Sequence, residues 1–414
     1  MSIPFKRHIL ENGLRLIVHE DHTTPLAACN LVYHVGSRDE NPNLTGIAHL
    51  FEHFMFCGSK NIPSYDEPLQ KVGAINNAYT SQDHTHYYVI LPANNLETAL
   101  WLESDRMLDL AFQPAAFEIQ KKVVIEEFKE TTLNRPFGDL WSSFNDFVFE
   151  EYPYKWMPIG KEVAHIECID LPLMKDFYVQ YYCPNNAVLV IGGDVYFEEV
   201  VKMVEKWFGD IPRGAETAKD FPAEPVQTAA KFSCLERLAP YGMLLKGWKM
   251  PPRLHPDFCA YDLLSDLLGT GNSSYLYQKL VIEEKVFSDI SASVTGTEGP
   301  GIFSIVARPL DTISIENANE KLNDFLYHQF SFDERLPHDL QKVKNRNETV
   351  LLTNEMKMDS RTSILAVSET ISQIEDFEND HEDYQKVTEG QVERIYRETI
   401  QDQKDNTLFY IPMK

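Results

Sequence analysis

The chain has 414 residues, 38 of them Lys or Arg and 63 Asp or Glu, so its formal net charge is −25. With 43% hydrophobic and 12% aromatic residues, the composition is that of a folded globular protein and excludes disordered, collagenous and disulfide-scaffold chains. The length exceeds the about 100–200 residues of a typical domain, which predicts two or more domains. The acidic balance argues against nucleic acid as a partner, because binding to phosphates would work against the field of the whole protein.

Targeting and membrane signals are not recognisable in the sequence. The first residues, MSIPFKRHIL, are not followed by the apolar run of a secretory signal, and no stretch approaches the about 20 apolar residues that span a bilayer. The six cysteines are dispersed and form no C-x-x-C pair. We therefore expect buried thiols in a reducing compartment, and a cytoplasmic protein that makes no membrane contact.

Strands and helices are mixed in the first half of the chain. Alternating or short apolar runs predict strands, and longer periodic runs that Pro114 and Pro136 interrupt predict helices. The expected strands cover 14–19, 26–35, 74–80, 85–91 and 187–193, and the expected helices cover 96–111, 115–133, 140–150 and 197–208.

A polar, Pro- and Ala-rich segment without periodicity, 214–231, is predicted to be a linker. A similar order of elements recurs beyond it. The expected elements are strands near 241–248, 290–295 and 302–308, a helix over 257–268, and then helices to the end. We expect an α+β fold of two related halves, 1–213 and 232–414, each a mainly antiparallel sheet covered by helices.

The run GIAHLFEHFMFCGS carries the most informative residues, His49, Glu52 and His53. Histidines at positions i and i+4 of a helix share a face, so both imidazoles can reach one metal ion, and an acid at i+3 lies beside them. The flanking apolar residues indicate a buried helix, where unpartnered histidines and a glutamate would be costly. A metal ion accounts for all three side chains.

A catalytic zinc needs three protein ligands and an open position, so a third ligand must come from elsewhere in the chain. The predicted helix EIQKKVVIEEFKE offers Glu126, Glu127 and Glu130 on adjacent faces. Spacing alone does not choose among these three glutamates.

These residues resemble a known family. The order H-x-x-E-H is the inverzincin signature, and the chain resembles the pitrilysin superfamily, which includes insulin-degrading enzyme and the mitochondrial processing peptidase. The resemblance extends over most of the chain. It includes VGSRDE, INNAYTSQDHTHYY, VVIEEFKE, YYCPNNAVLVIGGDV and GNSSYLYQKLVIEEK.

The resemblance implies a role for each matching residue. It implies that His49, His53 and Glu127 bind one Zn²⁺ and that Glu52 is the general base that activates water for attack on a peptide carbonyl. It also implies that a segment of four residues holds the substrate backbone by strand addition. These residues are Asn77, Ala78, Tyr79 and Thr80.

The chain departs from the family pattern at three positions. Gln120 stands where many relatives have a second acid, which we expect to tune the site rather than abolish it. Val281 and Ser288 stand where active relatives have an Arg and a Tyr that help to hold the substrate. Neither residue supplies a positive charge or a phenolic hydroxyl.

The second half has no counterpart of the metal motif. A shift of 211 residues brings Ala260, Leu263 and Leu264 over the three motif residues, which predicts a metal-free second half. Together with Val281 and Ser288, the resemblance therefore implies that the chain has only the zinc half of a split site. We expect a homodimer, or a heterodimer with a homologous subunit that supplies Arg and Tyr.

The leading hypothesis is a zinc metalloendopeptidase, an inverzincin that hydrolyses peptides or unfolded protein segments. The alternative is a non-catalytic peptide-binding or assembly subunit of a processing-peptidase-like complex. His84 and His86 share a strand face, but they lack an obvious third ligand and are interpreted as polar residues near the edge strand.

Overall fold

The computed structural model describes residues 3–217 and 219–413. Residues 1–2, 218 and 414 lie outside the described residues, so the predicted linker 214–231 is described except at residue 218. Within the described chain, no helix is both long and apolar enough to cross a membrane.

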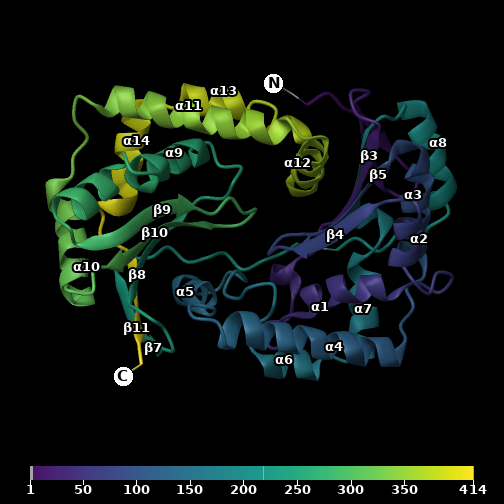
Figure 1. Ribbon diagram of the computed structural model, residues 1–414, viewed down its shortest axis with the longest axis horizontal. Helices are drawn as coiled ribbons and strands as arrows, with labels where there is room; N and C mark the ends of the chain where they lie inside the picture. The colour runs from purple at the N-terminus through teal and green to yellow at the C-terminus, as the bar shows by residue number, and fades with distance from the viewer. Residues whose placement is uncertain (1–2, 218, 414) are drawn as a thin grey trace. The chain divides into compact units, whose positions relative to one another are not determined.

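The strands form two mixed sheets (Figure 1). The first has the order β1-β2-β6-β3-β5-β4 and the second the order β7-β11-β8-β10-β9. The β2–β6 and β7–β11 pairings are parallel and all other pairings are antiparallel. Helices pack on both sheets, which confirms the predicted α+β class with mainly antiparallel sheets.

The strands of the first sheet are β1 (Lys6–Ile9), β2 (Arg15–Glu20), β3 (Leu26–Tyr33), β4 (Ile75–Thr80), β5 (Thr85–Pro92) and β6 (Ala187–Gly193). Those of the second are β7 (Lys231–Arg237), β8 (Met243–Met250), β9 (Phe287–Val294), β10 (Gly301–Pro309) and β11 (Asn406–Pro412). The helices are α1 (Ile47–Phe54), α2 (Asp66–Lys71), α3 (Leu96–Leu108), α4 (Pro114–Phe128), α5 (Leu140–Val148), α6 (Val163–Cys168), α7 (Leu171–Tyr181), α8 (Phe197–Phe208), α9 (Phe258–Gly269), α10 (Ile315–Asp324), α11 (Leu336–Glu355), α12 (Met358–Ile371), α13 (Asp380–Lys386) and α14 (Glu389–Ile395).

The chain folds into two compact units that are discontinuous in sequence. Of the described residues, those within 1–131, 156–221 and 352–379 form the first unit, and those within 132–155, 222–351 and 380–414 form the second. The division into domains at 214–231 stays a prediction about the two related halves. The compact units do not follow this division of the sequence. Helix α5 precedes the linker but belongs to the second unit, and α12 follows the linker but belongs to the first.

The core of the first unit lies on both faces of its sheet. One face packs against α1, α3, α4, α7 and α8 through a large apolar cluster that includes Leu31, Leu50 and Phe51. The other face packs against α12, where Leu365 and Ala366 contact the strands. Burial on both faces explains why the central strands are apolar runs.

The prediction that only helices follow 302–308 is wrong, because β11 joins the second sheet between β7 and β8. Its residues Leu408, Phe409 and Tyr410 are all buried, so the strand shows no alternation of apolar and polar residues. Such a short apolar run cannot be told from a helical segment by periodicity.

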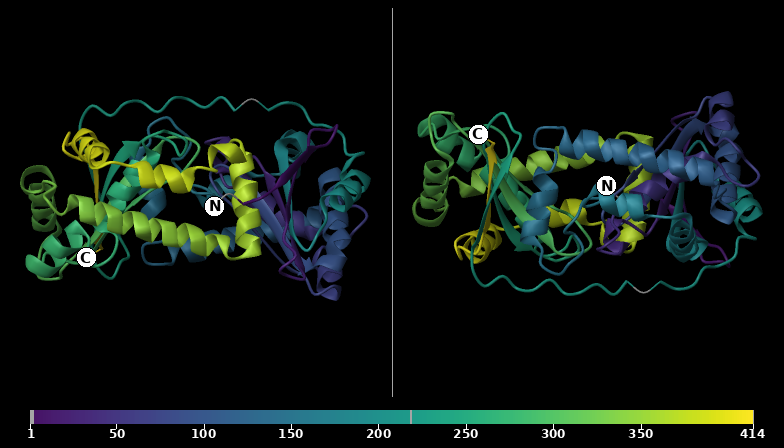
Figure 2. Two further views of the ribbon diagram at one scale, coloured as in Figure 1. Left: turned by 90° about the horizontal axis from the view of Figure 1, so that it is seen from above. Right: turned by 90° about the horizontal axis from the view of Figure 1, so that it is seen from below.

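The segment between α8 and β7 has neither helix nor strand over its described residues and is an extended trace in Figure 2. Side chains nevertheless anchor it. Lys219 Nζ lies 2.5 Å from the Asp39 carboxylate in the first unit. Glu224 accepts hydrogen bonds from three backbone N–H groups at 150–152 in the second unit.

Candidate metal centre

Helix α1 begins at a glycine and is held at its N-terminus by a buried carboxylate. Gly46 has a φ of 96°, which favours glycine, and precedes the first helical residue. Glu40 accepts hydrogen bonds from Gly46 N at 3.0 Å, Ala48 N at 2.9 Å and Trp156 Nε1 at 2.9 Å. Burial raises the pKa of Glu40 to about 8, although the hydrogen bonds from these donors act to lower it. The start of α1 is therefore fixed by specific contacts.

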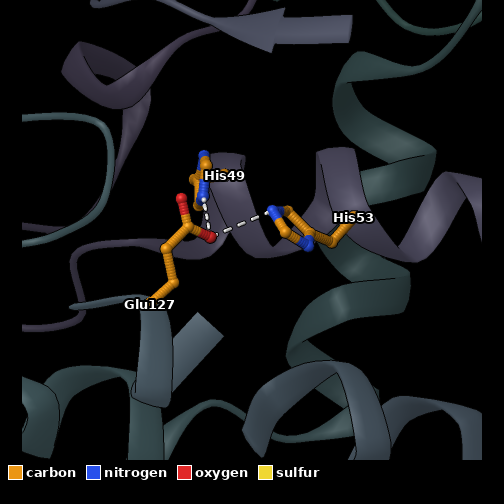
Figure 3. A group of neighbouring side chains, drawn as sticks. All are labelled: His49, His53 and Glu127. Carbon is orange, nitrogen blue, oxygen red and sulfur yellow. Dashed lines mark hydrogen bonds and ion pairs between the residues drawn. The ribbon is translucent and has the colours of Figure 1, made fainter. Parts of the chain in front are cut away.

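The structure brings His49, His53 and Glu127 together (Figure 3). Nε2 of His49 lies 3.3 Å, and Nε2 of His53 lies 3.4 Å, from Oε2 of Glu127. One ligand atom from each residue lies within 4.8 Å of the other two. Two imidazoles and one carboxylate are a donor set that zinc accepts, and ligand atoms around a tetrahedral zinc lie about 3.4 Å apart. The three residues therefore fit a zinc ion with one open position.

Glu52 lies next to this cluster. Its Oε2 is 3.6 Å from Nδ1 of His49, the ring nitrogen that does not face Glu127. The hydroxyl of Thr80 donates a 2.6 Å hydrogen bond to the same oxygen. Glu52 is thus a nearly buried carboxylate whose orientation is fixed from β4.

The acids give the cluster a strong preference for positive charge. Burial lowers the pKa of His49, but the contacts with Glu127 and Glu52 outweigh it and raise the pKa to about 9. Hydrogen bonds from His49 and His53 hold the pKa of Glu127 well below its usual range. A metal cation would take the place of the proton on His49, since an imidazole ligand must be neutral at the ligating nitrogen.

The three glutamates of α4 and the turn after it have different surroundings. Glu127 faces the histidines, whereas Glu126 forms an exposed ion pair of 2.7 Å with Lys129. Glu130 is exposed in a π-helical turn over Lys129–Leu133. Among the three candidates, the geometry favours Glu127 as a ligand.

The predicted substrate segment lies on β4, which ends the first sheet and pairs only with β5 among the described strands. Thr80 contacts Glu52 as described above, and Tyr79 O–H lies 3.0 Å from Nδ1 of His86. Oδ1 of Asn77 accepts a hydrogen bond of 2.9 Å from the backbone N–H of Ala78. Within the first unit, no described strand pairs with the outer edge of β4.

His84 and His86 belong to no cluster of metal ligands among the described residues. Burial lowers the pKa of His86 to about 3, so this side chain is neutral. Its Nε2 lies 2.8 Å from Oδ1 of Asn30. His86 is therefore a buried structural histidine that connects β3, β5 and β4.

The departures from the family pattern lie outside the cluster. Val281 packs partly buried against the core of the second unit, and Ser288 Oγ donates a 3.2 Å hydrogen bond to the carbonyl of Arg308. Gln120 lies on α4, where its hydrogen bond opposes the burial that raises the pKa of Cys57. None of these three side chains has a guanidinium group or a phenolic hydroxyl.

Sequence reasoning missed the residues that support the site. Glu40 lies in the run VGSRDE, whose polar character gives no hint that its last residue holds the start of α1. The contact of Thr80 with Glu52 joins two elements that are 28 positions apart. Knowledge that α1 lies against β4 would have been needed to find it.

Family models match two parts of the chain. The model described as Insulinase (Peptidase family M16) matches residues 15–136, and the one described as Peptidase M16 inactive domain matches residues 169–331. Zinc protease PqqE of Helicobacter pylori is 28% identical over 412 residues, which are 97% of this chain and 92% of that protein. The probable mitochondrial-processing peptidase subunit beta of Arabidopsis thaliana is 24% identical over 72% of this chain and 58% of that protein.

Solved structures share the fold. A protease from Helicobacter pylori has a TM-score of 0.91 at 26% identity, and the match covers 100% of both chains. The periplasmic protease PqqL from Escherichia coli has a TM-score of 0.81 at 19% identity and covers 100% of this chain. The match covers 48% of the PqqL chain, so this fold occupies about half of that protein.

Proposed function

The chain belongs to peptidase family M16, within the pitrilysin superfamily, and on this premise we propose that it is a zinc-dependent metalloendopeptidase acting on peptides or unfolded protein segments. The observation that carries the proposal is the cluster of His49, His53 and Glu127 beside the carboxylate of Glu52. Relatives named zinc proteases support the choice of metal. The free cysteines support the proposal of a cytoplasmic location. Three of them are buried as predicted, but the prediction of burial is wrong for Cys168 and Cys234, which are exposed.

Zinc would be held by His49, His53 and Glu127, and it would supply a Lewis acid that lowers the pKa of a water towards about 7. Glu52 is the general base: it accepts the proton from the attacking water and passes it to the leaving amine. The Thr80 hydroxyl, donating to Oε2, holds the carboxylate in place and leaves Oε1 for the proton. The peptide backbone pairs with the outer edge of β4 along the segment Asn77, Ala78, Tyr79 and Thr80.

The active form is a homodimer or heterodimer with a homologous subunit that supplies the missing Arg and Tyr. The support is Val281 and Ser288, neither of which can fill those roles. Relatives named as a beta subunit, and the PqqL chain of about twice this length, are consistent with paired halves. If the purified chain cleaves peptides as fast as a mixture with its homologous neighbour, this part of the proposal is wrong.

The second candidate is a non-catalytic peptide-binding or assembly subunit of a processing-peptidase-like complex, and its one support is the match of residues 169–331 to the model described as Peptidase M16 inactive domain. Stoichiometric zinc and cleavage would exclude it. Peptide binding by a protein that contains no zinc would support this second candidate.

The experiment is cleavage of a fluorogenic peptide library by the wild type and the Glu52→Gln variant, with and without the homologous subunit. We expect the variant to keep one zinc per chain and to lose about 10²–10⁴-fold in kcat/KM, the usual contribution of a general base. Glu126→Gln is the matched control, because it removes an exposed carboxylate one position from Glu127. Full activity of the Glu52→Gln variant would overturn the assignment.

A further inference from the structure

A cavity of about 390 Å³ lies within the first unit, between the sheet and α12. Its sheet side is formed by Asn30, Tyr79, Tyr88 and Ile90, and Asp359 and Ser363 contribute from α12. Its size falls within the range of about 300–1,000 Å³ that is usual for ligand pockets. The metal cluster does not contribute to this lining.

The cavity lies on the face of β4 opposite the metal cluster. Successive side chains of a strand point to opposite faces of the sheet. Thr80 points to α1, where it contacts Glu52, so Tyr79 points to the other face, where it meets His86. Figure 1 shows α12 and α1 on opposite sides of β4.

A peptide that pairs with β4 follows the same alternation. Every second side chain of the peptide faces the metal cluster, and those between face the cavity. Tyr79 of β4 lines the cavity, so the side chain of a peptide residue paired directly beside it lies on the same face as the cavity. The cavity is therefore placed to receive a substrate side chain.

A buried chain of hydrogen bonds holds the sheet side of the cavity. His86 is neutral, so its Nδ1 accepts from Tyr79 O–H and its Nε2–H donates to Oδ1 of Asn30. The hydroxyl of Ser363 donates to the same oxygen at 3.2 Å. Hydrogen bonds through His86 and Asn30 therefore connect Tyr79 on β4 to Ser363 on α12.

On the α12 side of the cavity, two polar side chains have no hydrogen-bond partner among the described residues. The side chains of Asp359 and Ser360 make no hydrogen bond or ion pair with any residue in 3–217 or 219–413. Asp359 is the one carboxylate in the lining, and no lysine or arginine lies there. An unpaired carboxylate in a partly enclosed site favours a cation that can bring its own hydrogen-bond donors.

We propose that this cavity is a subsite for a lysine or arginine side chain of the substrate, with Asp359 as the residue that selects it. The inference rests on the proposed function, because it requires an extended peptide on β4. The aliphatic part of the basic side chain packs against Tyr88 and Ile90, and its cationic end pairs with Asp359. The net charge of −25 adds a long-range attraction for basic peptides.

The test uses pairs of peptides that differ only in lysine or uncharged norleucine, moved one position at a time along the sequence. We expect the wild type to prefer lysine at one position by about 10-fold or more in kcat/KM, as one charge-assisted contact provides. Asp359→Asn should remove most of this preference. Asp359→Lys should reverse it, so that glutamate is preferred to glutamine at the same position.

The matched control is Asp176→Asn, which removes one exposed carboxylate from α7 outside the cavity and should keep the lysine preference. Circular dichroism and zinc content check that each variant is folded. An unchanged lysine preference in Asp359→Asn, or no reversal in folded Asp359→Lys, would overturn the proposal.

Binding separates this proposal from the proposed function. The same peptide pairs are titrated into the Glu52→Gln protein and into the Glu52→Gln, Asp359→Asn double variant, and followed by fluorescence anisotropy. A lysine preference that Asp359→Asn abolishes supports the subsite even if the wild type cleaves none of the peptides. Equal binding of lysine and norleucine peptides at every position overturns the subsite even if cleavage is observed.

Discussion

The shift of 211 residues predicts that helices α1 and α9 correspond in the two halves of the chain, and the side chains at the matched positions differ in kind and in burial. In α1 the side chains of His49, Glu52 and His53 keep exposed fractions of 16%, 10% and 25%. At the corresponding positions of α9, Ala260, Leu263 and Leu264 are at most 1% exposed and belong to the apolar core.

The difference between the two helices is one of stability as well as chemistry. A helix filled with apolar side chains is stabilised by its own packing. A helix with partly buried histidines and a glutamate depends on partners, here Glu127 and Thr80 and, under the proposed function, a metal ion. The first half should therefore respond to metal, and the second half should not.

The largest expected effect comes from placing the α1 pattern into α9. Leu263→Glu removes a fully buried leucine and leaves a charge without a partner, which should cost about 5 kcal/mol or more. Urea unfolding of the variant measures the loss. Ile282→Glu is the control, because Ile282 is 51% exposed and should change stability by less than about 0.5 kcal/mol.

Metal removal should lower the stability of the first unit and leave that of the second unit unchanged. With free zinc at about 100 times its Kd, chelation should lower the free energy of unfolding of the first unit by about 2.7 kcal/mol. Hydrogen exchange of backbone amides should become faster in α1 and α4 and stay unchanged in α9. Equal acceleration in both units would contradict a metal site in the first half alone.

A smaller effect is expected at the start of α1. Glu40→Gln keeps one acceptor oxygen but places an amide donor against Gly46, Ala48 or Trp156, which should cost about 2 kcal/mol. Thermal unfolding measures this change. Glu199→Gln on the exposed surface of α8 is the control, and an equal effect of the two variants would mean that Glu40 does not hold the helix.

Much of the site was predictable because it depends on local spacing. The i, i+3, i+4 pattern of His49, Glu52 and His53 needs one helix, and α1 covers all three positions. The strands β4 and β5 were predicted within one residue at each end, because their alternation and the turn between them are local signals. The choice of Glu127 among three glutamates came from the family resemblance and not from the spacing.

What the sequence could not predict depends on distant parts of the chain. Asp359 lies more than 270 positions from Tyr79, yet both residues line one cavity, since α12 packs on the first sheet. The buried strand β11 lacks alternation, and its parallel partner β7 lies 175 positions away. No local pattern encodes these pairings, because they depend on how surfaces fit in the folded chain.

The most direct test of the account is the anomalous X-ray scattering of crystals of the protein grown with zinc. We expect one anomalous peak per chain, between Nε2 of His49, Nε2 of His53 and a carboxylate oxygen of Glu127. Crystals of Glu127→Gln should lose most of that peak, and those of Glu126→Gln should keep it. A peak elsewhere, or none at these three residues in zinc-containing crystals of the wild type, would contradict the account.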